Sequence, residues 1–302
     1  MQQRLLPHLA LMTAMFIWST SYIALKIGLS AYAPLELMAW RMTVAALIFA
    51  PLWPRIRRSV RAHGRRKLLL LLLLCEPCLY FTCETHALRY TSASQAGMIV
   101  AMLPVTVSAA AWFALRERVS VHTAAGFAMA VGGVIWLSAD AVATENAPAP
   151  LLGNMLEALG MCCATIYTIS LKRLSEDYTP LQLTALQSLA GMIFFTLLSQ
   201  MVPAAEPLAP GRDLPVWAAP LAILYLGACV TFGGYGLYNY GVSRLPAGQA
   251  AAYTNLIPVL TLLLGVALLR EVFLPSQYAA SCLVLAGVLL SQRGGRRDGK
   301  GS

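Results

Sequence analysis

One stretch occurs twice in the chain, and this repeat constrains the fold more than any other feature of the sequence. The two copies occupy residues 93–104 and 247–258, and each carries a Gln near its start and a Pro at its end within an apolar run. The matched pairs, all 154 positions apart, are Gln95 and Gln249, Pro104 and Pro258, Arg116 and Arg270, and Glu117 and Glu271. Apolar runs alone resemble one another, whereas polar, proline and charged residues in one register predict two copies of a structural unit.

The composition places both copies in a lipid bilayer. Of the 302 residues, 58% are hydrophobic and 12% are charged, against about 25% charged in an average soluble domain. The net charge of +9 comes from basic residues between apolar runs, which is usual in membrane proteins. No nucleic-acid partner is therefore expected.

A membrane-spanning helix needs about 20 apolar residues, and the chain offers ten such runs. We therefore predict an all-α integral membrane protein with ten transmembrane helices, joined mostly by short loops. The predicted spans are 9–29, 34–54, 68–88, 93–115, 121–141, 152–174, 180–202, 217–242, 246–269 and 275–292.

Basic residues set the orientation of these spans, because cytoplasmic loops of membrane proteins are enriched in Lys and Arg. With both termini inside, 17 of the 22 Lys and Arg residues flank the cytoplasmic ends. They are Arg4, Arg55, Arg57, Arg58, Arg61, Arg65, Arg66, Lys67, Arg116, Arg118, Lys172, Arg173, Arg244, Arg293, Arg296, Arg297 and Lys300. The sequence thus predicts an N-in, C-in topology.

Each copy of the repeat has five spans. An odd number of spans makes the second copy enter the membrane from the opposite side, so the halves 1–145 and 146–302 are predicted to be inverted repeats. Residues 34–41 also parallel residues 180–187, at an offset of 146. Inverted repeats are typical of secondary transporters, whose halves rock about a site near the bilayer midplane.

The sequence of the two repeats resembles the EamA-type family of the drug/metabolite transporter superfamily. The resemblance rests on residues 87–96 with Pro104, Arg116-Glu117, Gly126 and Gly132-Gly133, and on residues 241–250 with Pro258, Arg270-Glu271 and Gly287. It covers about residues 9–292 and departs from the family pattern where Arg precedes each Glu. It implies ten helices in two inverted five-helix repeats and export of small metabolites, amino acids or drugs across a bacterial inner membrane.

Ionisable residues inside spans are the first candidates for a transport site, because they are costly there. Glu76, followed by Pro77, is the deepest charge in the chain and is expected to bind a substrate ammonium group or carry a coupling proton. A structural carboxyl that is protonated or paired with an Arg is the alternative. Glu157, Glu84 and His86 lie nearer helix ends, where side chains can reach water. Arg41 is expected to pair with neighbours rather than with a ligand.

Aromatic, amide and thioether side chains are expected to complete a mostly apolar cavity with a few polar groups, as in small-molecule sites. The predicted substrate-binding residues are Trp18, Tyr22, Glu76, Tyr80, Met98, Met102, Glu157, Tyr235, Asn239, Tyr253 and Asn255. Pro104 and Pro258 are predicted hinges, because each frees the carbonyl four residues earlier, of Val100 and Thr254. Static kinks are the alternative for both.

Motifs for other functions are missing from the sequence. It contains no phosphate-binding Walker loop and no zinc-protease or serine-hydrolase motif, so neither a pump nor an enzyme is expected, and no cofactor or metal. A channel, a non-transporting scaffold and, less favoured, an intramembrane enzyme stay open as alternatives to an exporter of amino acids or related amphipathic compounds. Substrate identity, proton coupling and homodimerisation are left undecided.

Overall fold

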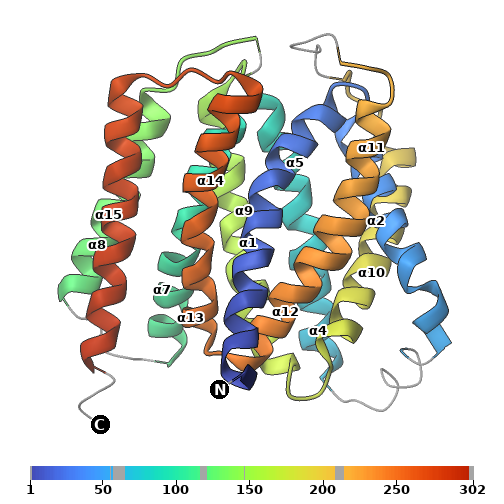
Figure 1. Cartoon of the computed structure of the whole chain (residues 1–302), viewed down its shortest axis with the longest axis horizontal. Helices are drawn as coiled ribbons and strands as arrows, with labels where there is room; N and C mark the ends of the chain where they lie inside the picture. Colours follow the sequence, from blue (N-terminus) through green and yellow to red (C-terminus); the bar gives the residue numbers. More distant parts are fainter. Residues whose placement is uncertain are drawn as a thin grey trace.

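The computed structural model describes residues 2–54, 56, 65–115, 121–145, 147–207 and 214–298. Helices make up nearly all of this part of the chain, and no strand is assigned within it. Arg116, Glu117 and most of the predicted basic loop 54–67 lie outside the described residues. The helices form a bundle whose rods run up and down between two ends, and both chain termini lie at the lower end in Figure 1. Below, "upper end" and "lower end" refer to that view.

The helical elements follow the predicted spans closely. They are α1 (Gln2–Leu29), α2 (Pro34–Phe49), η1 (Ala50–Leu52), α4 (Arg66–Leu73), η2 (Leu74–Leu79), α5 (Tyr80–Tyr90), α6 (Ala93–Ile99), η3 (Val100–Met102), α7 (Leu103–Leu115), α8 (Val121–Ala139), α9 (Pro150–Leu174), α10 (Pro180–Met201), α11 (Ala218–Tyr225), η4 (Leu226–Gly234), α12 (Tyr235–Arg244), α13 (Ala247–Ala252), η5 (Tyr253–Asn255), α14 (Leu256–Leu264), η6 (Gly265–Leu269) and α15 (Pro275–Asp298).

Within the described residues, eight helical rods are long and apolar enough to cross a membrane. Two shorter apolar helices, Ala124–Ala139 and Pro275–Leu290, accompany them. Together these ten segments correspond one to one with the ten predicted spans. The protein is therefore an all-helical, multi-pass membrane protein.

Local sequence explains where many of the helices begin. Proline occupies the first position of α2, α9, α10 and α15, where its missing N–H costs nothing and its fixed φ suits a helix. At α10, Thr179 accepts from the Gln182 backbone N–H while the Gln182 side chain accepts from the Thr179 N–H. At α6, the Ser92 hydroxyl accepts from the Gln95 N–H at 3.1 Å. These caps satisfy amide groups that a helix start leaves unpaired.

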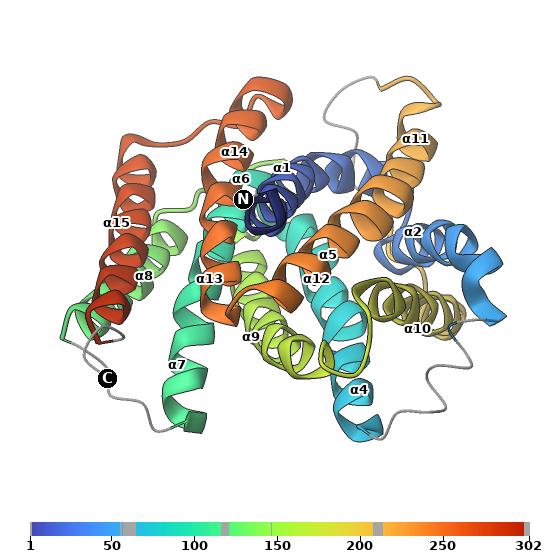
Figure 2. The same ribbon diagram turned by 60° about the horizontal axis from the view of Figure 1, so that its bottom comes forward.

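The bundle has a centre and two flanking pairs of helices (Figures 1 and 2). At one edge α8 packs along α15, and at the other α2 packs along α10. Gly133 and Gly287 allow the first pair to approach closely: an added Cβ would lie 2.9 Å from the Val284 backbone nitrogen and 2.5 Å from that of Ala130, respectively. Small residues of this kind are common where membrane helices touch. The central rods α1, α5, α9, α12 and α14 surround the site described next.

Candidate functional site

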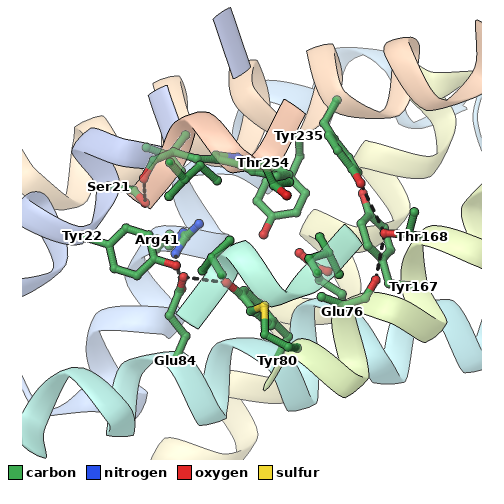
Figure 3. Close-up of a pocket in the computed structure, with 18 residues that line it drawn as sticks. Ser21, Tyr22, Arg41, Glu76, Tyr80, Glu84, Tyr167, Thr168, Tyr235 and Thr254 are labelled. Atoms are coloured by element: carbon green, nitrogen blue, oxygen red, sulfur yellow. Dashed lines mark hydrogen bonds and ion pairs between the residues drawn. The ribbon is translucent and has the colours of Figure 1, made fainter. Parts of the chain in front are cut away.

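A small cavity with several polar side chains in its lining lies inside the bundle, where α1, α2, α9, α12 and three interrupted helical rods meet (Figure 3). Its volume is about 30 Å³, which is room for about two water molecules. It is lined by Trp18, Ser21, Tyr22, Arg41, Glu76, Tyr80, Glu84, Val100, Leu103, Met161, Ala164, Tyr167, Thr168, Val230, Tyr235, Tyr238, Thr254 and Ile257. A substrate the size of an amino acid needs a wider space, so the bundle must open to admit one.

Breaks in three helical rods surround this cavity. Glu76, with φ −147° and ψ 117°, leaves the helical conformation directly before Pro77. The other two breaks are the 3₁₀ segments η3 and η5, which directly precede the turns that contain Pro104 and Pro258. Irregular backbone in a membrane is tolerated where it is buried in protein or lines a cavity. Val100 and Thr254, the residues predicted to have freed carbonyls, both line it.

Charged groups gather on one wall of the cavity. An Nη1 atom of Arg41 lies 3.7 Å from Glu84 Oε2, and both side chains are almost fully buried. Arg41 also donates from Nε to the Thr231 hydroxyl at 2.9 Å and lies over the Phe81 ring at 4.0 Å from its centroid. The guanidinium is thereby held in place by contacts on several sides. The Tyr80 hydroxyl donates to Glu84 Oε1 at 3.0 Å.

Two further carboxyl groups lie at this wall or beside it. Glu157 is fully buried behind Tyr22, whose hydroxyl donates to Glu157 Oε1 at 3.3 Å. Glu76 also lines the cavity, and its backbone carbonyl accepts from Gln187 at 3.3 Å. The site therefore combines three carboxyl groups with one guanidinium, which leaves an excess of acidic groups in a buried region.

Aromatic rings form the opposite wall. Trp18 lies 4.8 Å from both Tyr235 and Tyr238, measured between ring centroids, and Tyr167 stacks on Tyr238 at 6.1 Å. Behind them, Asn239 accepts from Tyr167 at 2.5 Å and donates to Thr184 and Gln187. Such a wall offers an apolar surface to a ligand while its hydroxyl groups stay hydrogen-bonded.

The predicted site residues fall into two groups in the structure. Five of them, Trp18, Tyr22, Glu76, Tyr80 and Tyr235, line the cavity. The others lie near it or apart from it. Glu157 contacts Tyr22 from behind, and Asn239 supports Tyr167.

The remaining predicted residues lie in other surroundings. Met98 belongs to a separate apolar cluster with Leu137, Phe273 and Ala280. Met102 packs against the main core, and Tyr253 contacts His8 through its hydroxyl. Asn255, like the other three, is not among the residues that line the cavity.

Sequence reasoning missed several lining residues, most notably Arg41, Tyr167, Thr168 and Tyr238. Arg41 was expected to pair with neighbours, and it does, but the partner is Glu84 on another rod and the pair faces the cavity. The repeat could have identified one of them. Thr168 is the residue that matches Tyr22 in the second copy, at the offset of 146, and both residues line the cavity.

The two ends of the bundle differ in how tightly they are closed. At the upper end Asn154 donates to Gln95 Oε1 at 2.9 Å and accepts from Thr91 at 2.7 Å. There the Glu271 carboxylate accepts from the backbone N–H groups of Ala93 and Ser94, at 2.7 and 3.0 Å. Charge-assisted bonds at a helix N-terminus are among the stronger ones. Among the side chains that close this end, Thr91, Gln95 and Asn154 are buried and Glu271 is half-buried.

The lower end contains a vestibule of about 690 Å³. It is lined by Leu6, Pro7, His8, Tyr240, Arg244, Leu245 and Gln249. Beside the bundle axis, exposed Arg65 joins α4 to the end of α9 through Glu176 at 2.8 Å and Asp177 at 3.3 Å. The hydrogen bond to Glu176 and the charge of Asp177 raise the pKa of Arg65.

Comparison with known proteins agrees with this architecture. The sequence pattern of the EamA-like transporter family matches residues 5–139 and again 151–292. A solved crystal structure superposes with a TM-score of 0.66 at 20% identity, covering 95% of this chain and 98% of that chain. This likeness supports the fold.

Relatives with curated names point the same way. A protein of Bacillus subtilis named uncharacterized transporter YcxC is 27% identical, over 93% of this chain and 91% of its own. A probable terminal-alkyne amino-acid exporter of Streptantibioticus cattleyicolor is 27% identical, over 96% and 95%. A probable amino-acid metabolite efflux pump of Salmonella typhimurium is 24% identical, over 93% and 92%.

An all-helical bundle with a buried polar cavity and interrupted helices defines the class of membrane transporters. Within this class the chain belongs to the EamA-like transporter family, which the family pattern matches over nearly its whole length. It is a multi-pass protein of the bacterial inner membrane. The family and the names of the relatives indicate transport rather than catalysis.

Proposed function

We propose that this protein is a secondary transporter that exports small amphipathic metabolites, amino acids or related compounds, by alternating access. All ten helical rods cross the membrane, both termini lie in the cytoplasm, and the halves 1–145 and 146–302 are inverted five-helix repeats. One observation carries the proposal: a buried site at three helix breaks is sealed at the upper end of the bundle, whereas the lower end contains a wide vestibule. The names of two relatives support the substrate class.

The lining of the cavity supports the repeat. Val100 and Thr254 line it together, as do Leu103 and Ile257, and both pairs are 154 positions apart. Tyr22 and Thr168, which are 146 positions apart, do so as well. A cavity lined by matched positions lies where two like units meet, which is the usual place for a transporter site.

Helix packing supports the same division. In the proposed repeat α1 and α9 are the first rods of the two halves. The rod of α5 packs on α9, and α12 packs on α1. The flanking pairs α2 with α10 and α8 with α15 join the second rods and the fifth rods. Each half therefore contributes the same elements to the interface, in exchanged positions.

The topology assigns the two ends to the two sides of the membrane. Of the 17 basic residues that the sequence assigns to the cytoplasmic side, Arg66, Lys172, Arg173 and Arg244 belong to helix ends at the lower end of the bundle, so the positive-inside rule makes this end cytoplasmic. The vestibule beside His8 and Gln249 then opens to the cytoplasm. The contacts of Asn154 and Glu271 seal the outward side. In this proposal the arrangement is an inward-facing state that takes substrate from the cytoplasm.

Alternating access follows from exchanging the roles of the two ends. Substrate enters through the vestibule and binds among Trp18, Tyr22 and Tyr235 as the cavity widens. The lower end then closes while the Asn154 and Glu271 contacts part. The breaks before Pro104 and Pro258 act as hinges, because backbone there lacks some of the hydrogen bonds of a regular helix.

Counterflow in proteoliposomes tests the proposal. Vesicles preloaded with an unlabelled amino-acid or metabolite mixture receive a labelled panel, using wild type, Glu76→Gln and the exposed control Glu145→Gln. Exchange by wild type and control, with loss in Glu76→Gln, is the expected result. Uptake that neither saturates nor exchanges would instead indicate a channel, and the absence of any flux across the panel would favour a scaffold.

A further inference from the structure

Two buried carboxyl groups beside the cavity each have one oxygen without a hydrogen-bond partner. These atoms are Glu84 Oε2 and Glu157 Oε2, and neither has a hydrogen-bond partner among the described residues. Glu84 Oε2 is the oxygen that lies 3.7 Å from Arg41 Nη1 in the ion pair, so Glu157 Oε2 is the more isolated of the two. Glu84 is 4% exposed and Glu157 is fully buried. Buried acceptors of this kind are rare in folded proteins, and each one calls for an explanation, such as a ligand that binds there.

The surroundings of Glu84 and Glu157 contain fewer positive charges than carboxyl groups. Each carboxyl receives a tyrosine hydroxyl on its other oxygen, from Tyr80 for Glu84 and from Tyr22 for Glu157. Among the described residues, Arg41 is the cation that an ion pair joins to them, through Glu84 at 3.7 Å. Two carboxylates with one guanidinium leave a place for one more positive charge.

A primary ammonium group matches this place. It carries one positive charge and three N–H donors, which is enough for Glu157 Oε2, the ion-paired Glu84 Oε2 and one tyrosine oxygen. The rings of Trp18 and Tyr22 border the same space and favour a cation and an apolar body. We propose that Glu84, Glu157, Tyr22 and Tyr80 form a binding site for a primary ammonium group carried by an aromatic or apolar body.

The same geometry disfavours a free carboxylate on the substrate. Arg41, the cation of the cavity wall, already contacts Glu84, Thr231 and Phe81. A substrate carboxylate would enter beside Glu76 and Glu84 without a free cation, and burying an unpaired charge is costly. The preferred substrates are therefore amines, amino-acid esters and amino-acid amides rather than free α-amino acids. This inference rests on the proposed transport function and narrows its substrate class.

A matched set of ligands tests the inference in the same counterflow assay. The set contains labelled phenethylamine, phenylalanine methyl ester, phenylalanine, N-acetylphenethylamine and the N,N,N-trimethyl derivative of phenethylamine. The amine and the ester are expected to exchange about tenfold faster than phenylalanine, because phenylalanine would bring an unpaired carboxylate into the buried site. The acetylated compound has lost its charge and the trimethyl compound has lost its donors, so both should exchange poorly.

Variants of Glu157 locate the site. Glu157→Gln should lower exchange of phenethylamine about tenfold or more, whereas Glu157→Asp, which keeps the charge, should retain a large part of it. Exposed Glu145 supplies the control Glu145→Gln, which should behave as wild type. Size-exclusion profiles of all variants separate a lost ligand contact from a misfolded protein. In addition, phenethylamine should raise the Tm of wild type but not of Glu157→Gln.

The outcomes separate this inference from the transport proposal. If phenylalanine exchanges and phenethylamine does not, the transporter stands and the amine site is wrong. Equal exchange of the trimethyl or acetylated compound overturns the ammonium site, as does an unchanged Glu157→Gln variant. If Glu157→Gln loses only the response to a pH gradient and keeps amine exchange, Glu157 carries a proton instead. If none of the five compounds exchanges or binds, the amine assignment fails, and the metabolite panel decides the transport proposal.

Discussion

The start of α6 at the upper end and the start of α13 at the lower end have related sequences but opposite surroundings. Gln95 is 5% exposed and bonded to Asn154, whereas its counterpart Gln249 is exposed beside the vestibule. Ser94 is fully buried, whereas an added Cβ at its counterpart Gly248 would meet nothing within 4 Å. Like sequences thus occupy unlike environments, so the environment is set by the arrangement of the halves.

This difference is what alternating access requires. A transporter with two related ends can close one end at a time. Each end here has a Gln in the first turn of a helix, Gln95 in α6 and Gln249 in α13. The energetic gap between the two arrangements has to be small, because a substrate can shift such an equilibrium only by its differential affinity. The predictions below test how firmly the upper end is closed and how open the lower end is.

The largest expected effect is on water access to the two glutamine positions. In a background without the native cysteines, Gln249→Cys should react with a polar maleimide roughly a hundredfold faster than Gln95→Cys, which corresponds to about 2.8 kcal/mol of protection. The reason is that one position borders the vestibule and the other lies within closed packing. Labelling rates in detergent-solubilised protein provide the measurement. Equal rates would remove the basis for an inward-facing state.

Next in size is a glycine comparison. Gly153→Ala would place a Cβ 2.7 Å from the Thr91 backbone nitrogen and 2.8 Å from the Ala87 carbonyl oxygen, so the upper end should lose about 1–3 kcal/mol. Gly248→Ala meets open space and should be neutral or gain up to about 1 kcal/mol from helix propensity. Thermal unfolding of the purified variants measures both. A greater loss in Gly248→Ala than in Gly153→Ala would contradict the assignment of tight and open ends.

A smaller effect is expected from Glu271→Gln. The carboxylate accepts from two backbone N–H groups at the start of α6, and an amide has only one oxygen to offer. The loss should be about 1–2 kcal/mol and should favour opening of the upper end. Labelling of a cysteine at position 95 should therefore accelerate, while the exposed control Glu206→Gln leaves it unchanged. If labelling does not change, Glu271 does not hold the upper end closed.

The smallest effect is expected at the surface of the lower end. The Arg65–Glu176 and Arg65–Asp177 contacts are exposed, and ion pairs of this kind contribute little because water and salt screen them. Glu176→Gln should leave thermal stability and transport close to wild type at moderate ionic strength. A clear drop in either would mean that the connection between α4 and α9 restrains the lower end.

Sequence reasoning reached the spans and the family but only part of the site. Periodic runs of about 20 apolar residues are a strong local signal, so the helices lie where they were predicted. Trp18, Tyr22, Glu76, Tyr80 and Tyr235 were found because aromatic and ionisable residues in spans are conspicuous. Met98 and Asn255 were predicted from residue type and position in a span in the same way. Residue type does not show which face of a helix borders the cavity, and neither residue lines it.

The sequence by itself determined the membrane class, the helical segments, the repeated register and the positions of the helix breaks, because hydrophobicity and proline act locally along the chain. Tertiary structure decided which side chains meet. Arg41 pairs with Glu84, Glu157 lies behind Tyr22, and Gln95 is buried while Gln249 is exposed. The physical reason is that burial and pairing of a side chain depend on the helix opposite, and one sequence register is compatible with both an open and a closed end.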